Sequence, residues 1–127
     1  MAVFKKKSQS SNKRRFTLYD ENVPFQVTEA YKTLRTNIVM ALATQRSKVF
    51  AVSSANAGEG KSTTAANLAI VFSQAGKKVL LIDADLRKPV QHRNFKLKND
   101  KGLSTLLGGI DSFKQALKSK AANLDIV

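Results

Sequence analysis

A glycine-rich loop is the feature that most limits how this chain can fold. The stretch "ANAGEGKS", residues 55–62, follows a short apolar run at residues 48–53 and leads directly into helix-forming residues. Gly58 and Gly60 allow the loop to curl with little side-chain obstruction, so that several backbone N–H groups converge on one anion. Strand, loop and helix in this order predict a phosphate-binding loop, with Ala55 at the position that is Gly or Ala.

The polar residues of this loop have distinct expected tasks. We expect Lys61 to reach the β- and γ-phosphates of a nucleotide and Ser62 to offer its hydroxyl to Mg²⁺, while the helix that starts there adds its unpaired amides. The residues expected to bind the nucleotide are Ala57, Gly58, Glu59, Gly60, Lys61, Ser62 and Thr63. The alternative is a glycine-rich turn with an incidental lysine, which the flanking strand and helix disfavour.

A second apolar strand follows the loop and its helix. Residues 62–75 have helical periodicity and are stopped by Gly76, and residues 79–82 form a buried-looking run. Residues 48–83 therefore predict one β-α-β unit with parallel strands and a right-handed crossover. The fold class that we predict is α/β, a P-loop NTPase-like parallel sheet flanked by helices.

Two carboxylates follow this second strand, Asp83 and Asp85. Because parallel strands end at the same edge of a sheet, both face the crevice of the phosphate loop. One would hold Mg²⁺ and the other would take a proton from an attacking hydroxyl, so we predict that Lys61, Asp83 and Asp85 are catalytic and that Ser62, Asp83 and Asp85 bind the metal. Two structural alternatives stay open: Asp83 caps the next turn, and Asp85 forms a surface pair with Arg87.

The remaining pattern predicts further elements. Residues 27–44 read as an amphipathic helix whose apolar face comprises Val27, Tyr31, Leu34, Ile38 and Ala41 or Leu42. Its polar face would meet solvent or a partner. After Pro89 we expect, in order, a basic loop or short helix at 90–101, a short helix at 102–109, a helix at 112–120 capped by Asp111, and a third strand starting at 124.

Composition limits the class of protein. The 127 residues suffice for one domain, there are no cysteines, and the 22 Lys and Arg exceed the 9 Asp and Glu to give a net charge of +13. We predict a flexible basic tail at 1–24, which either contacts anionic lipid or only adds solubility, and a P-loop domain at 25–127. Basic residues do not alternate with aromatic ones, so nucleic acid is not an expected partner. The expected location is the cytoplasm, at the inner face of the plasma membrane.

The two acidic and glycine-rich motifs resemble those of the bacterial tyrosine kinases of capsular and exopolysaccharide operons. "VFAVSSANAGEGKSTTAANLA" is similar to their loop S-S-x-x-P-G-E-G-K-S-T, except that Ala57 replaces the proline, and "VLLIDADLRKP" matches their D-x-D-x-R motif. The helix "EAYKTLRTN" resembles their oligomerisation motif E-x-x-R-x-x-R, with Glu29 and Arg35 in place and Lys32 replacing an arginine. The resemblance covers roughly residues 25–127.

The resemblance implies autophosphorylation on tyrosine with ATP and Mg²⁺, in which the loop lysine and serine bind MgATP and the aspartates bind metal and activate the hydroxyl. It further implies a transmembrane polysaccharide co-polymerase or modulator as partner, self-association into a ring, and a role in polysaccharide synthesis and export. The family's third acidic motif and its tyrosine-rich tail find no match, so we expect an N-terminal fragment with little or no kinase activity alone.

Two other functions compete with this one. Partitioning and septum-placement ATPases share the fold, but they carry a second lysine early in the loop, where this chain has Asn56. A nucleotide-dependent adaptor without enzymatic activity would dock a membrane partner through the basic tail and the helix at 27–44.

Overall fold

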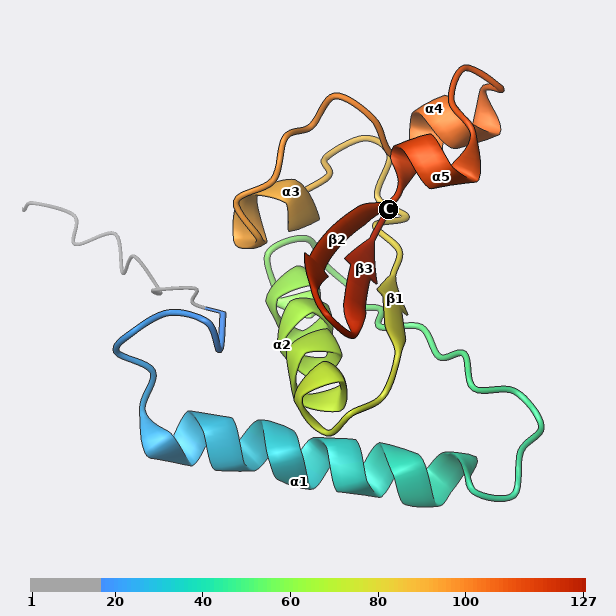
Figure 1. Cartoon of the computed structure of the whole chain (residues 1–127). Coiled ribbons are helices and arrows are strands. Elements are labelled where there is room, and N and C mark those ends of the chain that lie inside the picture. Colours follow the sequence, from blue (N-terminus) through green and yellow to red (C-terminus); the bar gives the residue numbers. More distant parts are fainter. Residues whose placement is uncertain (1–16) are drawn as a thin grey trace, which may run out of the picture.

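The computed structural model describes residues 17–127 and contains a three-stranded sheet with helix α2 packed on one face (Figure 1). In chain order the elements are α1 Phe25–Leu42, α2 Lys61–Gln74, β1 Val79–Leu81, α3 Gln91–Asn94, α4 Leu103–Leu107, α5 Phe113–Ala116, β2 Lys118–Ala121 and β3 Leu124–Ile126. Within this described part, no helix has both the length and the hydropathy needed to cross a bilayer.

Helix α2 is the centre of the molecule. It begins after Gly60, ends just before the turn at Gly76, and packs against α1, α3, β1 and β3. Its buried residues are Ala66, Asn67, Leu68, Ala69, Ile70, Val71 and Ser73. Small residues such as Ala66 and Ala69 allow the neighbouring elements to approach this helix closely.

Helix α1 lies across α2 and confirms the predicted amphipathic helix (Figure 1). Val27, Tyr31 and Ile38 are half-buried, but no residue of α1 is fully buried. The predicted apolar face is wrong at Leu34, which is 38% exposed. Arg35 is half-buried instead, because its guanidinium Nη1 donates a hydrogen bond to the backbone oxygen of Val71 in α2 at 3.0 Å.

The sheet has the order β1-β3-β2, with β1 and β3 parallel and β2 and β3 antiparallel. The strands predicted at 79–82 and from 124 are confirmed as β1 and β3. The predicted α/β fold class is confirmed, with β1 and β3 as a parallel pair, whereas the antiparallel neighbour β2 was not expected. Alternation along β1 directs Val79 and Leu81 toward the core, whereas Leu80 is 43% exposed.

Strand β2 occupies residues that the sequence assigned to a helix. The helix predicted at 112–120 ends at Ala116, because Leu117 turns to an extended conformation with φ −72° and ψ 130°. Its cap is Ser112 and not Asp111: the Ser112 hydroxyl accepts from the backbone N–H of Gln115 at 3.3 Å. For residues 90–101 the sequence predicts a basic loop or a short helix, and the structure has the one-turn helix α3 followed by a loop; the short helix predicted at 102–109 is confirmed as α4.

The strand predicted at 48–53 is wrong, and the β-α-β unit built on it is therefore not formed. This segment has no regular secondary structure and joins no strand ladder, and Val49 is 82% exposed. Phe50 instead packs its ring against Phe72 of α2, with ring centroids 5.9 Å apart. An apolar run indicates burial, but a strand also needs a neighbour to bond, and β1 bonds only β3 in the described chain.

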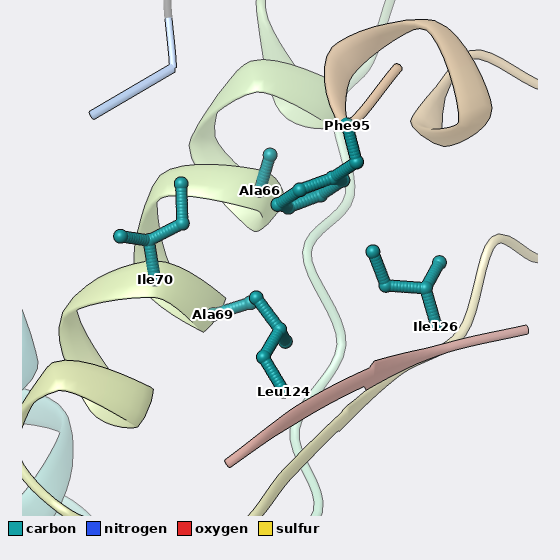
Figure 2. Close-up of a cluster of buried hydrophobic side chains, with 6 residues drawn as sticks. All are labelled: Ala66, Ala69, Ile70, Phe95, Leu124 and Ile126. Carbon is teal, nitrogen blue, oxygen red and sulfur yellow. The ribbon is translucent and has the colours of Figure 1, made fainter. Parts of the chain in front are cut away.

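The core lies between α2 and the sheet. Ala66, Ala69 and Ile70 of α2 belong to one buried cluster with Phe95, just after α3, and with β3 (Figure 2). The residues that β3 contributes are Leu124 and Ile126. Phe95 is 1% exposed, so the loop after β1 is fixed to the same core that holds α2.

The first described residues also pack on this body. Of the tail predicted at 1–24, residues 1–16 lie outside the described part. Thr17 is 6% exposed, and the backbone N–H of Leu18 donates to the Asn67 side-chain oxygen at 2.9 Å. Leu18 also packs against the core, so residues from 17 onward belong to the body of the molecule.

Candidate functional site

The phosphate loop ends in two residues with left-handed backbone. Gly58 has φ 81° and Gly60 has φ 92°, a region that residues with a side chain adopt only at a cost. A Cβ built on Gly60 would meet no atom within 4 Å, so backbone conformation and not space calls for glycine there. The first helical hydrogen bond runs from Thr64 N to Gly60 O at 2.9 Å. The amides of residues 61–63 therefore precede the helical ladder and are placed to face an anion.

Side chains within the loop hold its shape. The backbone N–H and the side-chain amide of Asn56 both lie 3.3 Å from carboxylate oxygens of Glu59. The Ser54 hydroxyl donates to the Asn56 backbone oxygen at 2.9 Å. Glu59, which we predict to bind the nucleotide, thus contacts Asn56. These contacts between the two residues hold the loop in its closed shape.

Lys61 and Asp85 come together as the sequence predicts. Lys61 Nζ lies 3.9 Å from Asp85 Oδ2, and the two side chains are 35% and 37% exposed. The other oxygen, Asp85 Oδ1, accepts the backbone N–H of Lys88 at 3.0 Å. The backbone N–H of Lys88 is the largest cause that lowers the pKa of Asp85 below its ordinary value. Burial opposes it, and the charge of Lys61 adds a smaller lowering effect. The alternative surface pair of Asp85 with Arg87 is not the one that forms.

Asp83 organises the loop that follows β1. Its Oδ1 accepts the N–H of Asp85 at 3.2 Å, and its Oδ2 accepts the N–H groups of Val90 and Gln91, both at 3.0 Å. The capping role that the sequence left open for Asp83 is therefore real. A carboxylate offers about four lone-pair positions, so three N–H donors leave it able to accept one more partner.

The residues at this edge fit a magnesium ion held jointly with phosphate. Residues 17–127 contain no cluster of three or more His, Cys, Asp or Glu side chains that could hold a metal. Mg²⁺ does not need one, because it is usually held by one or two carboxylates together with phosphate oxygens and waters. Ser62, Asp83 and Asp85 supply a hydroxyl and two carboxylates, which is the oxygen set this ion prefers.

Gln91 is a residue of this site that the sequence did not single out. It is 4% exposed, and its side-chain Nε2 donates to the Ser62 backbone oxygen at 2.9 Å. Its own backbone N–H is one of the donors to Asp83. A glutamine in a basic loop reads as a surface residue, so only the burial found in the structure reveals this contact.

The three residues predicted for oligomerisation lie on α1 and have intramolecular partners. Lys32 Nζ lies 2.9 Å from Glu29 Oε1 in an exposed pair one turn apart. Arg35 points inward to Val71, at the carboxyl-terminal end of α2. Ring assembly through these residues stays a prediction.

Comparisons with known proteins show which family the chain belongs to. The family model described as the CobQ/CobB/MinD/ParA nucleotide binding domain matches residues 50–127. The tyrosine-protein kinase YwqD of Bacillus subtilis is 53% identical over 100 residues, which are 78% of this chain and 42% of the relative.

Solved structures give the same picture. The kinase domain of the Escherichia coli tyrosine kinase ETK aligns with a TM-score of 0.75 and 30% identity over 85% of this chain and 46% of the other. The chimerical protein CapA2B2 aligns with a TM-score of 0.69 and 40% identity over 78% and 44%. The chain thus spans less than half the length of these relatives. The predicted resemblance to the bacterial tyrosine kinases is confirmed, and the chain belongs to the CobQ/CobB/MinD/ParA nucleotide binding domain family.

Proposed function

We propose that this chain supplies the MgATP-binding part of a bacterial protein-tyrosine kinase. The observation that carries the proposal is the position of Lys61, at the start of α2 behind two left-handed glycines and 3.9 Å from Asp85. Asp83 accepts the backbone N–H of Asp85 and so holds the loop that carries Asp85. A cation, helix amides and two carboxylates at one edge of a sheet are the parts that phosphoryl transfer needs.

Each side chain has a task in this proposal. The amides of residues 61–63 and Lys61 hold the β- and γ-phosphates, and the Ser62 hydroxyl and Asp83 face the metal. Bound Mg²⁺ would neutralise charge on the phosphate oxygens. Asp85 accepts the proton of the attacking tyrosine hydroxyl. An aspartate is ionised at neutral pH, as a proton acceptor must be, and the lowered pKa of Asp85 does not change this.

The finer assignment follows from the resemblance of both motifs and of α1. The whole protein would autophosphorylate on tyrosine, associate into a ring, and bind a transmembrane polysaccharide co-polymerase or modulator at the inner face of the plasma membrane. It would regulate capsular or exopolysaccharide synthesis and export.

The position of Asn56 argues against the partitioning type of ATPase. In that class a lysine at this position reaches the nucleotide of a partner subunit. Here the Asn56 side chain lies 3.3 Å from Glu59 within its own loop and carries no charge. For the whole protein incubated with Mg[γ-³²P]ATP, label on its own tyrosines supports the kinase. Rapid release of free phosphate without such label would support the ATPase.

Nucleotide binding is tested by substituting the loop lysine. We expect calorimetry to show that MgATP binds the chain and that Lys61→Ala weakens binding at least about tenfold, because a charge-assisted contact to phosphate is lost. Lys78→Ala, at an exposed position before β1, is the matched control and should bind as the unsubstituted chain does. Equal affinity for all three proteins would contradict the proposed function.

A further inference from the structure

The buried Gln91 connects α2, the helix that follows the phosphate loop, to the loop after β1 that carries Asp83 and Asp85. We call this second segment the acidic loop. Gln91 is the first residue of α3 and is 4% exposed, although α3 itself is only one turn long. Buried polar side chains are normally held by hydrogen bonds, so the partners of Gln91 tell what it does.

Gln91 forms hydrogen bonds through both its side chain and its backbone. Its Nε2 donates to the backbone oxygen of Ser62 at 2.9 Å, and its Oε1 accepts from the Asn94 side-chain amide at 3.0 Å. Its backbone N–H donates to Asp83 Oδ2 at 3.0 Å. Gln91 therefore touches the first turn of α2 with its side chain and the acidic motif with its backbone.

We infer that Gln91 is a positioning residue that fixes Ser62 relative to Asp83, an inference that rests on the proposed function of these two as magnesium ligands. An ion shared between a hydroxyl on one element and a carboxylate on another binds well only if both elements keep one separation. The phosphate loop and the acidic loop are 21 residues apart in sequence at these positions, and Gln91 bonds both.

The chemistry of the side chain suits this task. A neutral amide presents a donor to Ser62 and an acceptor to Asn94, and it adds no charge beside the proposed metal site. Methionine has nearly the same length and volume but neither donor nor acceptor. Gln91→Met would keep the packing, leave the backbone bond to Asp83 in place, and remove only the link to Ser62 and Asn94.

The test compares ATP binding with and without the ion in the full 127-residue chain. Calorimetric Kd values for ATP are measured in Mg²⁺ and in EDTA, and the ratio of the two is the magnesium enhancement. We expect Gln91→Met to reduce this ratio about tenfold, as loss of a group that orients metal ligands does, while ATP affinity in EDTA changes little. The melting temperature without nucleotide reports on folding separately.

The chain offers a matched control and a second variant. Gln115→Met makes the same replacement in α5, where the side chain only accepts the N–H of Ser112, and should leave the enhancement unchanged. Gln91→Leu also removes both amide contacts without adding a charge, so it should behave as Gln91→Met does even if that variant folds poorly.

Three results would overturn the inference. The first is an unchanged enhancement in both Gln91 variants. The second is an equal loss of ATP affinity in Mg²⁺ and in EDTA, which would assign Gln91 a purely structural role. The third is an unsubstituted chain that binds ATP no better with Mg²⁺, which would also overturn the proposed function; the first two leave that function intact.

Discussion

Asp83 has two roles that are often divided between residues: it holds the loop after β1, and it is a proposed ligand of Mg²⁺. Its carboxylate accepts three backbone N–H groups and so determines the path from β1 to α3. The same ionised oxygens face the edge where a phosphate-bound cation is proposed. A carboxylate is the side chain that meets both needs, because its charge strengthens the bonds from backbone amides and attracts the metal.

Two substitutions of Asp83 should separate its structural role from its proposed role as a magnesium ligand. Asp83→Ala removes an acceptor of three amides and should lower the free energy of unfolding by about 2 kcal/mol, as loss of a helix cap does. Asp83→Asn keeps an acceptor oxygen, so it should cost less stability but remove the magnesium enhancement of ATP binding. Urea unfolding and calorimetry measure the two effects. Asp100→Ala, at a side chain 58% exposed, is the control for stability.

The ionisation of Asp85 gives a second prediction at the level of residues. Its lowered pKa means that the ionised form favours the folded state at pH values above the ordinary carboxyl pKa of about 3.9. This contribution to stability is lost as the pH falls through the lower, folded-state pKa. A carboxyl ¹³C NMR titration should therefore show Asp85 titrating below its ordinary range.

Lys61→Met tests the causes of that shift. We expect it to raise the pKa of Asp85 only part of the way, because the Lys88 N–H bond, the larger cause, remains. A full return to the ordinary value would show that Lys61 alone sets this pKa. Lys78→Met is the matched control and should leave the titration of Asp85 unchanged.

Among the elements, α1 depends on an unusual anchor. It buries no residue fully, so its apolar contacts with α2 are shallow. Arg35 adds a charged hydrogen bond to the Val71 oxygen, within the last turn of α2, where the helix dipole favours a positive group. The arginine that the resemblance assigns to ring assembly thus holds α1 to the body of its own chain.

Substitution of Arg35 should consequently affect the isolated chain. Arg35→Ala should lower the free energy of unfolding by about 1.5–3 kcal/mol, the range for a hydrogen bond to a charged group. Lys32→Ala, which removes an exposed pair with Glu29, should cost less than about 1 kcal/mol. Equal stability of the two variants by urea unfolding would show that the Arg35 bond does not anchor α1.

The elements also show which features the sequence could predict. The helices α1 and α2 and the strands β1 and β3 follow from periodicity, and the end of α2 follows from Gly76, since these signals are local. The segment 48–53 and strand β2 could not be predicted, because pairing depends on which neighbours a strand meets. For the site, Lys61, Asp83 and Asp85 follow from spacing, whereas the bonds of Gln91 depend on how α3 folds back onto α2.

Over the whole molecule, one aromatic side chain ties the site to the core. Phe95 is 1% exposed and lies between α2 and β3, only four residues after Gln91 (Figure 2). The ring of Tyr19 meets it edge-on, with centroids 6.3 Å apart. The position of the acidic loop therefore depends on the packing of Phe95, because α3 has only one turn with which to hold its own shape.

Phe95→Ala should accordingly be among the most destabilising single changes in this chain. Loss of a buried aromatic ring costs about 3–5 kcal/mol through lost burial and the cavity left behind. Phe113→Ala removes the same ring where it is 50% exposed and should cost much less. If Phe95→Ala still folds, its magnesium enhancement should fall as well, since α3 is then less well fixed. If Phe95→Ala is as stable as Phe113→Ala, the α2–β3 core does not support the acidic loop.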